Sequence, residues 1–196
     1  RIRWHVVVFL APAVLVYTAV MIFPLFDTLR LALFNTEEKA RVFVGLANFR
    51  RLFLDPNWSE QFWNALANNF WFFLIHMLVQ NPIGIALAAL LSSPKLRFAA
   101  LYRTAIFVPT ILSFVIVGFA WKLILSPIWG IAPSMLDAIG LKSLFAPWLG
   151  KEEYALTTLA LISVWQFVGI PMMLIYAALL SIPEEILEAG EVDGIT

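Results

Sequence analysis

The sequence contains no cysteine among its 196 residues. This absence excludes a disulfide framework, a thiolate metal site and a cysteine nucleophile. Charge is scarce as well, because Asp, Glu, Lys and Arg make up only 13% of the chain, whereas about a quarter is usual in a soluble domain. The 13 basic residues are scattered and balanced by 13 acidic ones. No basic face is therefore available for phosphates, and nucleic-acid binding is excluded.

Enzyme motifs are missing too. The chain has no His-Glu-x-x-His zinc motif, no Gly-x-Ser-x-Gly nucleophile turn, no phosphate-binding loop and no pair of aspartates inside an apolar stretch. We therefore expect a noncatalytic protein that holds no metal and no other cofactor. If its work is driven by nucleotide hydrolysis, another chain must carry out that hydrolysis.

Apolar residues are abundant: they make up 62% of the chain and give a mean hydropathy of +0.88. Four apolar stretches, 6–26, 70–91, 105–125 and 155–180, are long enough for the roughly 20 helical residues that cross a hydrocarbon core. The first is longer than the apolar part of a signal peptide, about 7–15 residues, so we interpret it as a retained span. The sequence thus predicts an all-α membrane protein with four transmembrane helices in a lipid bilayer.

The basic residues predict how these helices are oriented, since Lys and Arg concentrate in the cytoplasmic flanks of membrane helices. They are densest before the first apolar stretch and in the short connection 92–104, at Arg1, Arg3, Lys95, Arg97 and Arg103. The other two connections are longer and carry them at lower density. We therefore expect the N-terminus, the connection 92–104 and the C-terminal tail to be cytoplasmic.

The first outer connection carries helix signals of its own. Asn48 is placed to cap a short helix, Asp55-Pro56 to end it, and Ser59 to open another. Both segments are amphipathic and aromatic, which is typical of helices at the membrane interface. A binding surface for a partner outside the cell is an alternative that is compatible with this interpretation.

Two prolines lie near the middle of apolar stretches, Pro82 in the second and Pro171 in the fourth, and we expect helix kinks there. Proline lacks the backbone N–H, so a carbonyl four residues earlier loses its partner, at Leu78 and Phe167. Lipid cannot supply a hydrogen bond, so these carbonyls should face other helices or a cavity. Near the first kink, Gly84-x-x-x-Ala88 predicts a strip of close helix packing.

Polar and aromatic side chains gather near both kinks: His76, Gln80, Asn81, Trp165 and Gln166. Polar groups at such depth often mark a translocation path. A neutral, hydrogen-bonding lining of this kind would suit an uncharged polyhydroxylated solute. The alternative is that these side chains only bond to neighbouring helices.

The C-terminal tail, 182–196, carries the signals of a short acidic helix. Ser181 and Glu184 have the spacing of a capping box, Glu184 and Glu185 favour a helix N-terminus, and Gly194 predicts a stop. An acidic helix attached to a membrane segment suggests docking onto a partner rather than catalysis.

The tail also has a surface suited to close contact. Glu188 and Asp193 flank Ala189 and Gly190, so part of the predicted helix is nearly bare backbone. Another protein could approach such a surface closely.

The segment 181–194 resembles the cytoplasmic Glu-Ala-Ala loop of the permease subunits of ATP-binding-cassette (ABC) importers for carbohydrates, such as maltose, other oligosaccharides, polyols or glycerol phosphate. Supporting matches lie at 44–49, from 97 to 109 and at 163–166, so the resemblance covers nearly the whole chain. It implies the transmembrane domain of a type I ABC importer. Residues 1–196 would then be part of this domain, with four transmembrane helices and a cytoplasmic coupling helix.

The resemblance assigns roles to individual residues of the tail. Glu188 and Ala189 match the start of the family's motif, and Asp193-Gly194 match its turn. Two positions depart from it, because Gly190 replaces the second alanine and Ile195 replaces the alanine after Asp-Gly. Glycine keeps the small volume but destabilises a helix by roughly 0.5–1 kcal/mol relative to alanine. We therefore expect a more pliable helix that still docks.

The implied protein is a noncatalytic permease subunit in the inner membrane. Its implied partners are a second permease subunit, a dimeric ABC ATPase, an extracytoplasmic solute-binding protein and a sugar or polyol solute. Permeases of this family have five to eight spans, so we expect the chain to stop inside the coupling region, and a piece of this length not to transport.

Two other functions stay open on the residues alone. An ion- or proton-coupled secondary carrier could use His76 as its titrating group, although acidic residues are absent from the apolar stretches. An intramembrane enzyme or a scaffold is the other rival. The enzyme lacks a reactive pair of residues, and the scaffold leaves the acidic helix without a purpose.

Overall fold

The structure is a computed structural model that describes residues 3–35, 41–93 and 96–194. Arg1, Lys95 and Ile195, which entered the expectations above, lie outside the described residues. The chain divides into two compact units, 1–67 and 68–196, and each is described by itself. Among the described residues, two uninterrupted helices are long and apolar enough to cross a membrane, and two bent helix pairs meet the same test when each pair is taken together.

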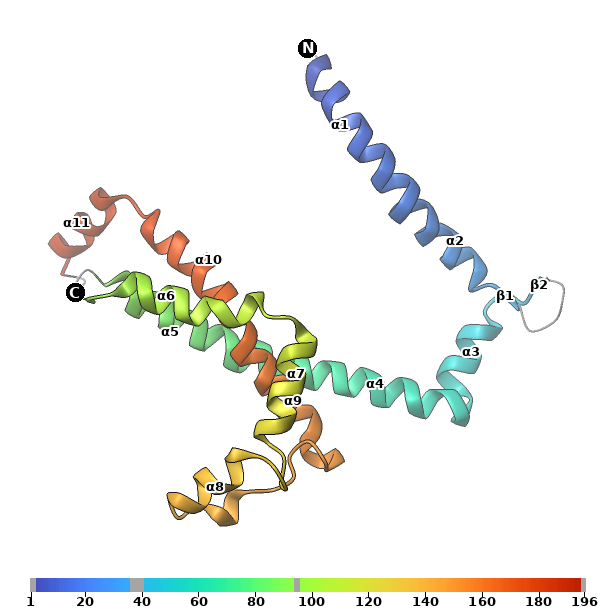
Figure 1. Ribbon diagram of the computed structural model, residues 1–196. Helices are drawn as coiled ribbons and strands as arrows, with labels where there is room; N and C mark the ends of the chain where they lie inside the picture. The colour runs from blue at the N-terminus through green and yellow to red at the C-terminus, as the bar shows by residue number, and fades with distance from the viewer. Residues whose placement is uncertain (1–2, 36–40, 94–95, 195–196) are drawn as a thin grey trace. The chain divides into compact units, whose positions relative to one another are not determined.

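Span one is the uninterrupted helix Trp4–Leu31 in the first unit. It consists of α1 (Trp4–Tyr17), a π-helical turn η1 (Thr18–Ile22) and α2 (Phe23–Leu31) (Figure 1). Pro24 follows the π turn directly. The wider turn makes room for the proline ring and absorbs the missing N–H without breaking the helix.

A small hairpin follows span one. Strands β1 (Phe34–Asn35) and β2 (Val42–Phe43) pair antiparallel. The side chain of Asn48 donates to the carbonyls of Ala32 (2.8 Å) and Phe34 (3.0 Å). Asn48 therefore holds the hairpin and does not cap a helix as predicted. Its side chain reaches backbone acceptors more than ten residues earlier, which a capping pattern cannot anticipate.

Helix α3 (Ala47–Leu54) ends before Asp55, and α4 (Pro56–Ile75) begins at once. A carboxylate oxygen of Asp55 accepts from the N–H of Asn57 at 3.0 Å, so Asp55 serves the start of α4. The prediction that Ser59 opens this helix is wrong, because Ser59 lies inside it. Helix α4 also continues into the second unit as part of a span, so only α3 is a separate short helix.

Span two is the 37-residue helix Pro56–Ser92, formed by α4, a π-helical turn η2 (His76–Gln80) and α5 (Asn81–Ser92). Here again the π turn lies just before a proline, Pro82. The predicted kink at this position is thus a local widening within a continuous helix.

Span three is not the single helix 105–125 that the sequence predicts. It consists of α6 (Ala99–Phe107) with the 3₁₀ turn η3 (Val108–Ile111), followed by α7 (Phe114–Ile124) at an angle of 99°. Leu112 and Ser113 between them are extended, and the Ser113 hydroxyl accepts from the N–H of Val115 at 3.3 Å. This cap starts a new helix in a new direction.

The connection between spans three and four contains α8 (Ile131–Ala138) and the 3₁₀ turn η4 (Lys142–Leu144). Span four then comprises α9 (Glu152–Phe167) and α10 (Gly169–Leu180), bent by 40° between them, before Pro171. The last helix, α11 (Glu184–Val192), follows α10 after a short turn (Figure 1).

The packed core of the second unit lies between spans two and four. Helix α10 runs along α5 and also packs against α6 (Figure 1). A Cβ at Gly84 would lie 3.1 Å from Cγ of Pro171, and Ala88 is fully buried beside Met172. The predicted small-residue strip is thus confirmed, since Gly84 and Ala88 let α5 and α10 approach closely.

Candidate functional site

Spans two and four are joined by three hydrogen bonds between residues 86 or 87 positions apart: Trp71 with Thr157 (3.0 Å), His76 with Ser163 (3.1 Å), and Gln80 with the Phe167 carbonyl (3.1 Å). The partners advance together along the chain, so the two spans run in the same direction. Span three must then return between them. This arrangement agrees with the alternating course that the sequence predicts.

His76 has both ring nitrogens engaged by its surroundings. Nδ1 lies 2.8 Å from the Phe72 carbonyl, which can only accept, so Nδ1 carries the proton. Nε2 lies within hydrogen-bond distance of the Ser163 hydroxyl on span four. The ring also lies against Phe72 with centroids 4.4 Å apart. This geometry suits a residue that packs spans two and four together.

Gln80 supplies the hydrogen bond that Pro171 cannot make within its own helix. The predicted loss of a partner at the Phe167 carbonyl is met by the side-chain amide of Gln80, which donates to it at 3.1 Å. Gln80 is buried, and its amide oxygen finds no hydrogen-bond partner among the described residues. The side chain is therefore anchored through its donor.

Gln166 joins span four to the break in span three. Its amide nitrogen donates to the Leu112 carbonyl at 3.1 Å, and its own backbone carbonyl accepts from the Thr110 hydroxyl at 3.0 Å. Gln166 is 2% exposed, so these bonds form away from water. Gly169 allows the approach, because a Cβ there would lie 3.0 Å from the Ile106 carbonyl oxygen.

The five predicted path residues thus fall into two groups. His76, Gln80 and Gln166 form hydrogen bonds to neighbouring spans, which was the alternative to a role in lining a path. Among the described residues, Asn81 contacts Met77 on its own helix, with its amide nitrogen 3.5 Å from the sulfur. Trp165 is 44% exposed, so Asn81 and Trp165 stay the more accessible candidates for a path.

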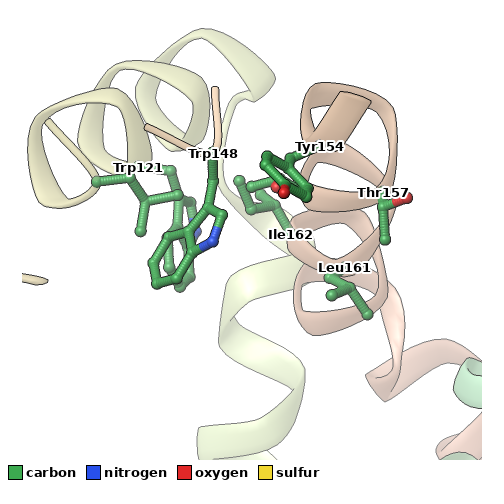
Figure 2. A pocket seen from close by; sticks show the side chains of 8 residues that line it. Trp121, Trp148, Tyr154, Thr157, Leu161 and Ile162 are labelled. Atoms are coloured by element: carbon green, nitrogen blue, oxygen red, sulfur yellow. The ribbon is translucent and has the colours of Figure 1, made fainter. Parts of the chain in front are cut away.

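An aromatic pocket of about 400 Å³ lies between α7, α9 and the connection that joins them, and Trp121, Trp148, Tyr154 and Thr157 are among its walls (Figure 2). The Trp121 ring packs edge to face on Trp165, with centroids 5.4 Å apart. The Thr157 hydroxyl already accepts from Trp71. The walls are otherwise almost entirely apolar and would leave the hydroxyls of a sugar unpaired. Sequence reasoning missed this pocket because its aromatic residues follow no regular spacing.

The acidic helix α11 forms with a different start from the one predicted. The Ser181 hydroxyl donates back to the Ala178 carbonyl at 2.7 Å and so belongs to the end of α10. The first backbone bond of the next turn runs from the N–H of Ile186 to the Pro183 carbonyl at 3.1 Å. The capping box is therefore wrong. Glu184 and Glu185 do lie in the first turn, where the helix dipole favours them.

The motif residues of α11 present an open surface. Glu188 and Ala189 are exposed, and a Cβ added at Gly190 would meet nothing within 4 Å in the described part of the chain. Gly194 has φ +81°, a left-handed conformation that ends the helix as predicted. Small residues therefore leave a strip of backbone accessible on α11.

Known proteins share this fold and much of this sequence. The chain is 34% identical over 189 residues to a probable ABC transporter permease protein, YurN, of Bacillus subtilis strain 168, covering 95% of this chain and 63% of the relative. It is 33% identical over 187 residues to the lactose transport system permease protein LacF of Rhizobium radiobacter, covering 95% of this chain and 61% of LacF. No family model matches the chain.

A solved structure gives the same result for the fold. A bacterial ABC transporter involved in the import of the acidic polysaccharide alginate matches with a TM-score of 0.80 and 25% identity, over 98% of this chain and 63% of that one.

The fold is therefore that of the transmembrane domain of an ABC importer. In sequence the chain is similar, over 95% of its length, to permease proteins of ABC transporters. It spans about six tenths of the length of the curated relatives that it matches.

Proposed function

We propose that the chain is the membrane-spanning part of a permease subunit in an ATP-driven sugar importer, and that α11 couples it to a separate ATPase dimer. The observation that carries this proposal is α11 itself, on which Glu188 and Ala189 are exposed and Gly194 is left-handed, as the resemblance to the family's coupling motif leads us to expect. The names of several relatives support a sugar as solute, since they include permeases for lactose, arabinooligosaccharides and alpha-glucosides.

The same proposal includes the further partners of such an importer. A second permease subunit would complete the path, and an extracytoplasmic binding protein would deliver the solute. The alginate transporter has also been solved with a periplasmic protein that carries an alginate pentasaccharide. In this arrangement the N-terminus, the connection between α5 and α6, and α11 face the cytoplasm, and Asn81 and Trp165 are the best placed to line the path.

The test compares two identical charge removals on α11, in the complete protein assembled with its partners. Glu188→Gln lies in the motif, whereas Glu185→Gln lies in the first turn outside it. We expect Glu188→Gln to lower the sugar imported per ATP hydrolysed about fivefold or more, the range of a moderate coupling free energy. Glu185→Gln should leave this ratio near that of the unmodified protein.

Equal ratios in both variants would contradict the coupling role of α11. Uptake that continues without the ATPase and collapses with an ion gradient would instead show the secondary carrier.

A further inference from the structure

We infer that Gln80 and Gln166 are positioning residues that tie the breaks of spans three and four into one joint, so that α7 and α10 reorient together. The consequence of the joint for coupling rests on the proposed function, because α10 leads directly into α11. The joint itself is a property of the described side chains.

On the side of span four, the joint begins at Pro171. The missing N–H of this proline leaves the Phe167 carbonyl without a helical partner. Gln80 donates to that carbonyl from span two at 3.1 Å. The bend of 40° between α9 and α10 is therefore held from a neighbouring helix.

On the side of span three, the joint lies at the bend of 99°. Leu112 is extended, so its carbonyl cannot take part in the helix that ends before it or the one that starts after it. Gln166 donates to this carbonyl at 3.1 Å. The hydroxyl of Thr110, two residues before Leu112, donates to the backbone carbonyl of Gln166 at 3.0 Å. Two bonds in opposite directions thus connect the two breaks.

The backbones can meet this closely because glycine stands at the contact. A Cβ at Gly169 would lie 3.0 Å from the Ile106 carbonyl oxygen and 3.2 Å from the Thr110 hydroxyl. Both glutamines are buried, so water cannot replace their hydrogen bonds. The carbonyls at Phe167 and Leu112 consequently depend on these two amides.

The joint also places aromatic residues that could meet the solute. Trp165 precedes Gln166 on α9, and Trp121 lies on α7 beyond the bend, with their rings 5.4 Å apart. If the bend opened, α7 would swing and this ring pair would separate. Gln166 therefore acts on the path through Trp121 and Trp165 rather than by touching the solute.

The experiment puts spin labels on introduced cysteines, because residues 1–196 contain none of their own; any cysteine elsewhere in the assembly is first replaced by serine. Leu101→Cys on α6 and Phe119→Cys on α7 put labels at two exposed positions on either side of the bend. The distance between the labels is measured by pulsed electron paramagnetic resonance in the complete protein, assembled with its partners in a bilayer. We expect one narrow distribution for the unmodified joint.

Two variants break the joint and a third is the matched control. Gln166→Met keeps the size of the side chain but removes the donor, and Thr110→Val removes the hydroxyl that bonds to Gln166. Thr104→Val is the control: it likewise removes a threonine hydroxyl, but this hydroxyl donates to the Ala100 carbonyl within α6 itself. The label distance should shift or broaden in the first two variants and stay unchanged in Thr104→Val.

Transport provides the second readout. Maximal uptake by Gln166→Met and Gln80→Met should fall about fivefold or more. The sugar concentration that gives half-maximal uptake should stay the same, because neither side chain contacts the solute.

An unchanged label distance in both Gln166→Met and Thr110→Val would overturn the joint. A raised half-saturating concentration with an unchanged distance would also overturn it and show path-lining residues instead. The label distances do not depend on what energises transport. A failed Glu188 test would therefore remove the ATPase coupling but leave the joint standing.

Discussion

Spans one and two each accommodate a proline inside a long helix, but they differ in how closely other segments pack around them. Both are long helices with a π turn just before a proline, at Pro24 and at Pro82. Within its own unit, span one buries none of its most apolar segment, whereas span two buries 28% of its own. A proline can thus be accommodated by the helix alone, but a joint needs neighbouring spans that supply donors and close contacts.

The difference follows from the side chains beside each proline. In span one the Thr28 hydroxyl bonds to the Pro24 carbonyl of its own helix at 2.8 Å. In span two, His76 and Gln80 reach across to span four. Within its own unit, span one therefore leaves its apolar surface uncovered, whereas span two organises a core.

The largest expected effect breaks this contrast at the core. Met172→Ala removes a fully buried side chain between α5 and α10, while Leu15→Ala removes an exposed one from span one. The cavity left by Met172→Ala should lower the free energy of unfolding by about 2 kcal/mol or more. Leu15→Ala should change it by less than about 0.5 kcal/mol. Unfolding of both variants in a denaturing detergent series measures these two losses. Losses of similar size would refute the contrast.

A smaller effect is expected where α6 meets α10. Gly169→Ala puts a methyl group 3.0 Å from backbone atoms of α6. Gly118→Ala is the matched control, because no described atom lies within 4 Å of the methyl group that it adds. The crowded variant should lose about 1–3 kcal/mol of stability. The open one should gain roughly 0.5–1 kcal/mol from its better helix propensity. The same detergent series measures both, and a gain in Gly169→Ala would contradict the close contact.

The smallest effect is expected in the first unit. Asn48→Ala removes two hydrogen bonds, one to the Ala32 carbonyl at the end of α2 and one to the Phe34 carbonyl in the hairpin, a loss of about 1–2 kcal/mol that should stay local. Amide hydrogen exchange should speed up at Val44, which donates to the Leu33 carbonyl beside this hairpin. Exchange in α10 should not change. Equal acceleration in α10 would show that the two units do not behave separately.

Sequence reasoning succeeded where a residue acts on its own backbone. Pro171 predicted the unpaired carbonyl at Phe167, and Gly194 predicted the helix end, because a missing N–H and a left-handed φ are local properties. It could not name Gln80 as the donor to Phe167. That partner lies 87 positions away, and only the packing of two helices brings it there.

The same limit explains the wrong predictions. The sequence predicted a single helix over 105–125, but the chain bends by 99° at Leu112 and Ser113, where the side-chain amide of Gln166 donates to the Leu112 carbonyl. Asn48 and Ser181 both have residue types that favour capping, and both bond to other carbonyls. A capping pattern describes what a side chain can do, while the neighbouring backbone decides which acceptor it reaches.

The central claim is that α11 docks on an ATPase, and crosslinking tests it most directly. Residues 1–196 contain no cysteine, and any cysteine elsewhere in the assembly is first replaced by serine. Ala189→Cys then puts one thiol on the exposed strip of α11, and Ala138→Cys makes the same change on α8, which the proposed function places on the outer side of the membrane. A short thiol crosslinker is applied to the complete protein assembled with its partners. We predict a product that contains the ATPase subunit from Ala189→Cys and none from Ala138→Cys. The absence of that product from Ala189→Cys, or equal amounts from both variants, would contradict the account.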